Sequence, residues 1–106
     1  MIIPMMAAAA MLAGASAEPR QAYAACLKDA AANAKVSKVS ADGFKAYAQQ
    51  SCAAAEDSFR KVLAAFNVKN GMGKKSAVED AQVQIDDYVY TADENYRFSF
   101  QLPKKR

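Results

Sequence analysis

The chain has 106 residues, with 14 Lys and Arg, 11 Asp and Glu, and a formal net charge of +3. It contains no His, which excludes Ser–His–Asp triads, imidazole bases and His-ligated metal sites. This modest positive charge does not by itself imply a nucleic-acid partner. Since a glycine-rich phosphate loop is also missing, we expect a protein that is not an enzyme and holds no cofactor or metal.

Residues 1–17 have the composition of a secretory signal peptide. Ile2 to Ala17 carries no charge, has an apolar centre and ends in Ala15-Ser16-Ala17, which favours cleavage before Glu18. No Lys or Arg precedes the apolar centre, which departs from the usual pattern. An N-terminal helix or a retained membrane anchor would share this composition, although a membrane span usually has about 20 strongly apolar residues. We expect a periplasmic or secreted protein with a single small domain over residues 18–106 and no transmembrane segment after cleavage.

The first predicted helix covers about residues 19–35. Pro19 suits the first turn of a helix, and apolar side chains recur at helical spacing from Tyr23 through Cys26 and Leu27. The segment from 36 to 39 then serves as a short linker.

The second predicted helix covers about residues 41–70 without interruption. Ser40 can cap its start, and Asn70-Gly71 supplies the left-handed residue that commonly ends a helix. Leu63 lies at the margin of its buried stripe. The predicted stripe consists of Phe44, Ala48, Cys52, Ala55, Phe59, Val62 and Phe66.

The third predicted helix covers about residues 77–97, after a capping box from Ser76 to Glu79. Beyond Tyr96, apolar and polar residues alternate as in a strand, with no second strand to pair with. We therefore expect this segment to lie extended across the helices, although a continued helix is the alternative. The predicted fold is all-α: an antiparallel hairpin of the first two helices, a third packed helix and an extended C-terminal tail.

Cys26 and Cys52 are predicted to form a structural disulfide. In an antiparallel hairpin turning at 36–39, the two residues fall within about 5 Å of the same height along the helices. Closing a loop of about 26 residues stabilises the fold by roughly 3–4 kcal/mol on the chain-entropy model. A redox-active pair is the alternative, but there is no CxxC spacing and no group that would lower a thiol pKa.

Paired carboxylates recur at intervals of seven in the third predicted helix and form a candidate partner surface. A basic partner would relieve their mutual repulsion, whereas a plain solvated face is the alternative. Calcium is a poor candidate, because ligands on a rigid helix cannot wrap around an ion. The six residues are Glu79, Asp80, Asp86, Asp87, Asp93 and Glu94.

The C-terminal segment combines aromatic and basic residues and is a candidate contact with the cell envelope. Phe98 and Phe100 precede Lys104-Lys105-Arg106, and an apolar segment with cations beside it can bind an anionic surface. Alternatively, the aromatic rings cover the alanine-rich helices and fill volume that alanine leaves empty.

The residues Tyr23-Ala24-Ala25-Cys26-Leu27, Phe44, Cys52, Glu56 and Arg60, with Asp87-Tyr88 in the last helix, resemble small exported two-cysteine helical bacterial proteins of unknown function. The resemblance covers most of residues 18–96 and brings no catalytic or binding residue with it. We expect a non-enzymatic interaction module with an unidentified protein or envelope partner, or alternatively a peripheral membrane binder acting through the C-terminal segment. A homodimer is compatible with alanine-rich helix surfaces.

Overall fold

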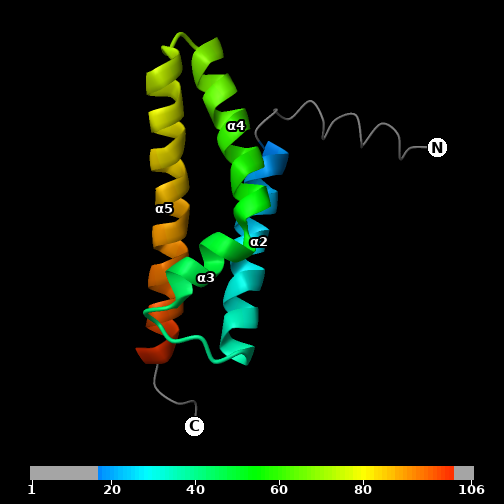
Figure 1. Cartoon of the computed structure of the whole chain (residues 1–106), viewed down its shortest axis with the longest axis vertical. Helices are drawn as coiled ribbons and strands as arrows, with labels where there is room; N and C mark the ends of the chain where they lie inside the picture. The colour runs from blue at the N-terminus through cyan, green and yellow to red at the C-terminus, as the bar shows by residue number, and fades with distance from the viewer. Residues whose placement is uncertain (1–16, 102–106) are drawn as a thin grey trace, which may run out of the picture.

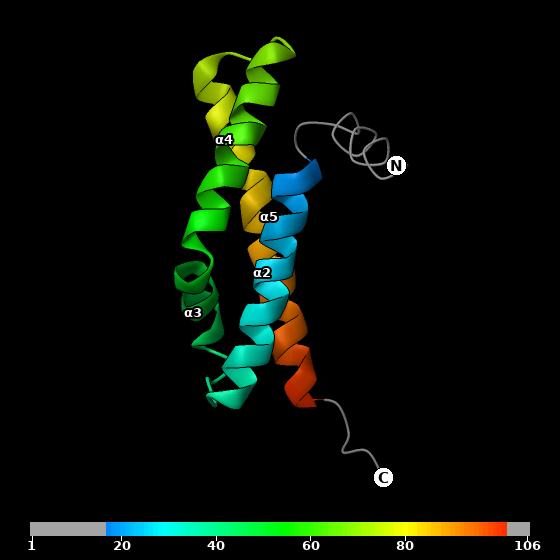
Figure 2. The same ribbon diagram turned by 90° about the vertical axis from the view of Figure 1, so that its right-hand side faces the viewer.

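The computed structural model describes residues 17–101, which form four helices and no strand. They are α2 (Ala17–Val36), α3 (Phe44–Ser51), α4 (Ala53–Lys69) and α5 (Lys74–Gln101). The predicted all-α class is therefore confirmed. α3 and α4 run antiparallel to α2, and α5 runs antiparallel to α4 and lies beside it (Figures 1 and 2). The end of α4 and the start of α5 extend beyond the start of α2. None of the helices within this range is long and apolar enough to cross a membrane.

The second predicted helix is divided at Cys52, so the prediction of one unbroken helix over 41–70 is wrong. Cys52 has φ −111° and ψ 22°, which departs from helical values, although its N–H still donates to Ala48 O at 2.9 Å. The chain bends there, and α3 crosses obliquely toward the end of α5 while α4 stays beside its start (Figure 1). The helix also begins later than predicted, at Phe44. Ser40 Oγ accepts the N–H of Gly43 in the turn before it, at 3.1 Å.

The bend also changes which side chains of α4 are buried. Phe59 and Leu63 are buried, and the next position of the stripe is Asn67 rather than Phe66. Phe66 is 54% exposed, so the predicted stripe is wrong beyond Phe59 and the residue assigned to its margin, Leu63, belongs to the core. The bend at Cys52 changes which face of α4 packs against α5. The predicted stripe was extrapolated along one straight helix and therefore did not account for this change.

The predicted end of the second helix at Asn70-Gly71 is confirmed. Gly71 has φ +98°, and the N–H groups of Gly71 and Met72 donate to Val68 O and Asn67 O, each at 3.0 Å. This pair of hydrogen bonds is a Schellman motif, which reverses the chain into α5. The side chain of Asn67 supports the same turn, because its Nδ2 donates to Ala77 O at 3.1 Å.

α5 is longer at both ends than the predicted helix over 77–97. It begins at Lys74, so the predicted capping box from Ser76 to Glu79 lies inside the helix rather than at its start. At the other end it continues to Gln101, and the predicted extended tail is wrong for residues 98–101. Helical geometry places Phe100 one turn after Tyr96, where the rings meet edge to face with centroids 5.1 Å apart. Residues 102–106 lie outside the described part of the chain.

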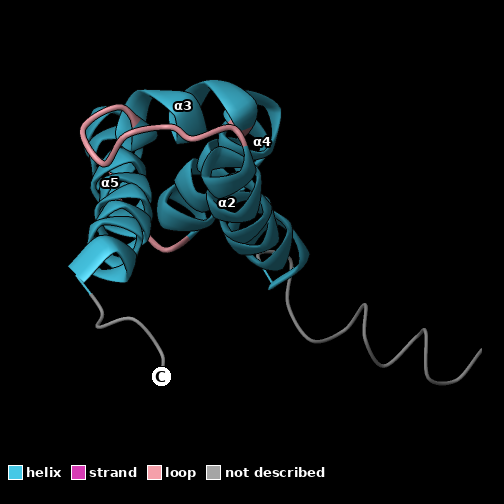
Figure 3. Cartoon of the chain, turned by 90° about the horizontal axis from the view of Figure 1, so that it is seen from below, coloured by secondary structure: helices cyan, strands magenta, loops and turns pink. Residues whose placement is uncertain are grey.

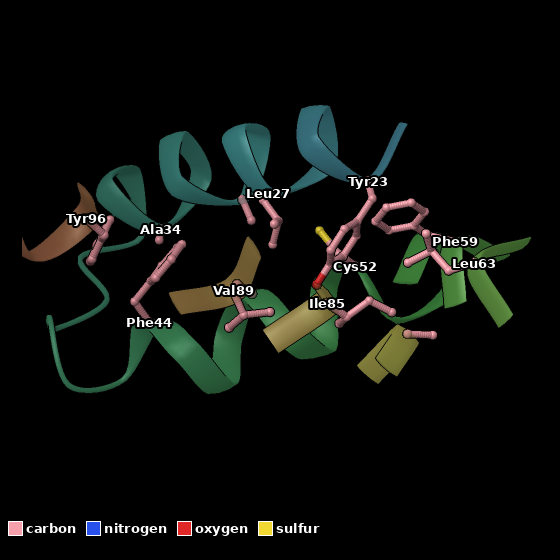
Figure 4. Packing of buried hydrophobic residues seen from close by; sticks show 13 residues of the cluster. Tyr23, Leu27, Ala34, Phe44, Cys52, Phe59, Leu63, Ile85, Val89 and Tyr96 are labelled. Carbon is pink, nitrogen blue, oxygen red and sulfur yellow. The ribbon is translucent and has the colours of Figure 1, made fainter. Parts of the chain in front are cut away.

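A single apolar core connects the four helices, with an aromatic group toward each end (Figure 4). The ring of Tyr23 in α2 lies 5.7 Å from that of Phe59 in α4 and 5.8 Å from that of Tyr88 in α5. At the other end, the rings of Phe44 and Tyr96 stack 4.2 Å apart. Between them the core consists mostly of alanine and aliphatic side chains, so the aromatic rings supply much of its volume.

Candidate functional site

The two cysteines are brought together as a disulfide that joins α2 to the bend between α3 and α4. The Cα atoms of Cys26 and Cys52 lie 5.9 Å apart, within the usual range for a bridge. Cys52 is buried and Cys26 is half-buried. The predicted signal peptide, by contrast, falls almost entirely outside the described residues. Its predicted cleavage point after Ala17 coincides with the first residue of α2.

The structure separates the six predicted acidic residues into two groups. Asp80 accepts hydrogen bonds from Asn67 Nδ2 at 3.1 Å and from Gln84 Nε2 at 3.0 Å. Asp93 accepts from Arg97 Nε at 3.1 Å, and Asp42 accepts from Arg97 Nη1. The hydrogen bond with Asp93, followed by that with Asp42, raises the pKa of the Arg97 guanidinium. Asp80 and Asp93 therefore have partners within the fold. The exposed members are Glu79, Asp86, Asp87 and Glu94.

Two exposed apolar side chains stand among the exposed carboxylates. Val83 is 58% exposed and Tyr90 is 63% exposed, and neither was identified from the sequence as part of a surface. A hydrogen bond from the Tyr90 phenol to Glu94, together with the charge of that carboxylate, raises the pKa of Tyr90. Helical spacing places Val83, Tyr90 and the four exposed carboxylates on one side of α5, away from the buried Tyr96. We call this set the outward face of α5: Glu79, Val83, Asp86, Asp87, Tyr90 and Glu94.

The two aromatic residues of the predicted envelope contact do not share a surface. Phe98 and Phe100 are both more than half exposed, but two residues along a helix correspond to a rotation of about 200°. The ring of Phe100 contacts Tyr96 and lies 4.0 Å from Nζ of Lys35 in α2, a cation–π contact. The basic residues of the same prediction, Lys104, Lys105 and Arg106, lie outside the described residues.

An open groove of about 860 Å³ lies between α2 and α5. Seen from below, α3 bridges α5 and α2 on one side of the bundle, whereas no described helix crosses the opposite side (Figure 3). The small side chains of several alanines leave this space, because they cannot reach the neighbouring helix. α2 contributes Gln21, Ala24, Ala25, Leu27, Lys28 and Ala31, and α5 contributes Asp87, Tyr88, Thr91, Ala92 and Asn95.

A smaller hollow of about 220 Å³ continues the groove toward the end of α5. The two share Ala31 and Asn95, and Lys35 lies at the edge of the smaller one. Near the other end, Arg20 Nη1 donates to Tyr88 Oη at 3.1 Å and joins α2 to α5. Sequence reasoning missed this groove, although the high alanine content of α2 and the lysines at positions 28 and 35 were visible signs.

Part-buried polar groups link α2 to α4 beside the disulfide. Tyr23 Oη donates to Glu56 Oε1 at 3.4 Å, and Glu56 forms a short ion pair with Arg60. Arg60 Nε in turn donates to Gln82 Oε1 of α5 at 2.9 Å. Burial, followed by the charge and the hydrogen bond of Glu56, raises the pKa of Tyr23 above the ordinary range of phenols. These groups satisfy one another, so we assign them to the fold.

Within residues 17–101, no group of three or more potential metal ligands comes together. Comparisons with protein-family models, with curated proteins and with solved structures found no match for this chain.

Proposed function

We propose that this chain is an exported interaction protein without catalytic activity, and that it binds its partner through the outward face of α5. The observation that carries the proposal is the exposure of Val83 and Tyr90 among four exposed carboxylates. Val83 and Tyr90 are seven residues apart and therefore lie on the same side of α5, and an apolar patch rimmed by polar groups can be the centre of a contact with another protein.

The charge distribution indicates the chemistry of the partner. The whole chain has a net charge of +3, yet residues 76–96 contain six carboxylates and no Lys or Arg. The outward face is therefore acidic on a basic protein, and it would attract a basic partner selectively. A partner helix or segment that carries Lys or Arg beside apolar residues would complement both of its features.

Two features support the export part of the proposal. The composition of residues 1–17 fits a secretory signal, and the Cys26–Cys52 bridge is of a kind that persists in oxidising compartments. The proposed location is the periplasm or the extracellular medium.

The test is capture of partners from an envelope extract on immobilised protein covering residues 18–106. The charge variant combines Glu79→Gln, Asp86→Asn and Glu94→Gln, and the apolar variant combines Val83→Ser with Tyr90→Ser. We expect each variant to lower recovery of the same basic protein by about tenfold or more, and we expect recovery by the parent to fall as salt rises.

The matched control neutralises three exposed carboxylates on other helices, Glu18→Gln and Asp29→Asn in α2 and Asp57→Asn in α4. This control should recover the partner as the parent does. Equal recovery by the parent, the charge variant and the apolar variant would show that the outward face is only solvated.

A further inference from the structure

The groove between α2 and α5 has an apolar floor and polar edges. Ala24, Leu27, Ala31 and Ala92 line it together with the ring of Tyr88, and they offer no charged group to a ligand. Its volume of about 860 Å³ lies within the range of roughly 300–1,000 Å³ that is typical of small-molecule sites. Such a lining favours a ligand that is apolar over most of its length.

The charges at the groove are arranged along its axis. Lys28 lies at its edge, and Lys35 lies seven residues further along α2, beside the smaller hollow that continues it. Neither lysine forms an ion pair with another described residue. The ring of Phe100 holds Nζ of Lys35 in place at 4.0 Å. Asp87 is the only carboxylate in the lining, near the other end, level with the first turns of α2.

We propose that this groove binds single-chain amphiphiles with an anionic head group. The apolar chain lies along the alanine floor, and the head group lies between Lys28 and Lys35, away from Asp87. This site shares only Asp87 with the outward face of α5. The variants that test that face leave Asp87 unchanged, so either proposal can fail without the other.

The length of the groove fits an extended chain. From Gln21 to Ala31, α2 rises by about 15 Å. A chain that lies along this stretch extends past Lys28 toward the smaller hollow beside Lys35.

The test is calorimetric titration of the oxidised protein, residues 18–106, with decanoate. Decyltrimethylammonium, with the same chain and a cationic head, and butyrate, with the same head and a short chain, are the comparison ligands. We expect saturable 1:1 binding of decanoate, and binding of both comparison ligands weaker by about tenfold or more.

Substitutions then locate the site. Ala24→Trp fills the groove, whereas Ala22→Trp places the same side chain on an exposed position of α2 that does not line it. Lys28→Glu with Lys35→Glu reverses the proposed head-group site, and Lys45→Glu on α3 is the charge control. We expect Ala24→Trp to abolish decanoate binding, Ala22→Trp and Lys45→Glu to leave it unchanged, and the double reversal to weaken decanoate while strengthening decyltrimethylammonium.

Absence of saturable decanoate binding to the parent would overturn the proposal. So would equal binding by the Ala24→Trp and Ala22→Trp proteins, which would place any bound amphiphile elsewhere. If the double reversal weakened the two ten-carbon ligands equally, the head-group assignment would be wrong. Circular dichroism of each variant, with helix content equal to that of the parent, ensures that a loss of binding is not a loss of fold.

Discussion

Gly71 is the residue on which the reversal between α4 and α5 depends. Its φ of +98° is strained for any residue with a Cβ, while an added Cβ would meet no atom within 4 Å. The cost of Gly71→Ala is therefore a backbone cost alone, and we expect a loss of about 1–2 kcal/mol in the free energy of unfolding, measured by urea denaturation. Gly71→Asn is the control and should lose less, since asparagine tolerates this conformation. Equal stability of the alanine variant and the parent would mean that the turn has another conformation.

A second residue-level prediction concerns Tyr23. The pKa of its buried phenol is raised, so the folded protein keeps the proton at a pH where the unfolded chain, with a phenol pKa near 10, releases it. The stabilising effect of the neutral phenol is complete below pH 10 and is lost as pH rises above it. Between pH 8 and pH 11 the free energy of unfolding of the parent falls, and we expect this fall to be smaller by about 1 kcal/mol in Tyr23→Phe. The measurement is urea denaturation of both proteins across this pH range.

Tyr47 is a half-buried tyrosine of α3, and Tyr47→Phe is the comparison variant for Tyr23→Phe. A parent and a Tyr23→Phe protein with parallel pH profiles would contradict the assignment of a neutral, buried Tyr23.

At the level of the elements, sequence patterns identified where helices lie but not how they bend. Apolar periodicity located α2 and the core of α5, and the Asn70-Gly71 pair correctly marked the end of α4. The bend at Cys52 leaves no local sign, because Ala53 to Ala55 are good helix formers. It accompanies tertiary contacts that the sequence does not reveal: α3 packs against both α2 and α5, and Cys52 is bridged to α2. The alternation around Phe98 and Phe100 was misleading, since contacts with Tyr96 and Lys35 favour the helix.

For the candidate surfaces, too, the sequence identified some of the residues but not their exposure. The carboxylates of α5 were visible as a heptad pattern, but only the structure distinguishes Asp80 and Asp93, which are half-buried, from the four exposed ones. Val83 and Tyr90 were not predicted as surface groups, because a sequence with many apolar positions does not reveal which of them a small bundle leaves uncovered. The groove depends on the separation of α2 from α5, a distance that no local pattern contains.

For the whole molecule, the disulfide is the contact with the largest expected effect. A domain of this size is stabilised by roughly 5–15 kcal/mol, and a bridge between residues 26 apart contributes roughly 3–4 kcal/mol of that. We expect Cys26→Ala with Cys52→Ala to lose about that amount in urea denaturation, and the parent treated with reductant to behave similarly. If both thiols of the native protein reacted freely with an alkylating reagent before reduction, the bridge would not exist in it.

The position of this bridge also determines which backbone cleavages leave the two fragments covalently joined. A peptide bond cut between α2 and α3, at Lys38 for example, leaves two fragments that the sulfur–sulfur bond still joins, because Cys26 and Cys52 lie on either side of the cut. A cut between α4 and α5, at Met72 for example, leaves both cysteines on the same fragment. α5, with the outward face and one wall of the groove, would then be held by noncovalent contacts alone and could dissociate.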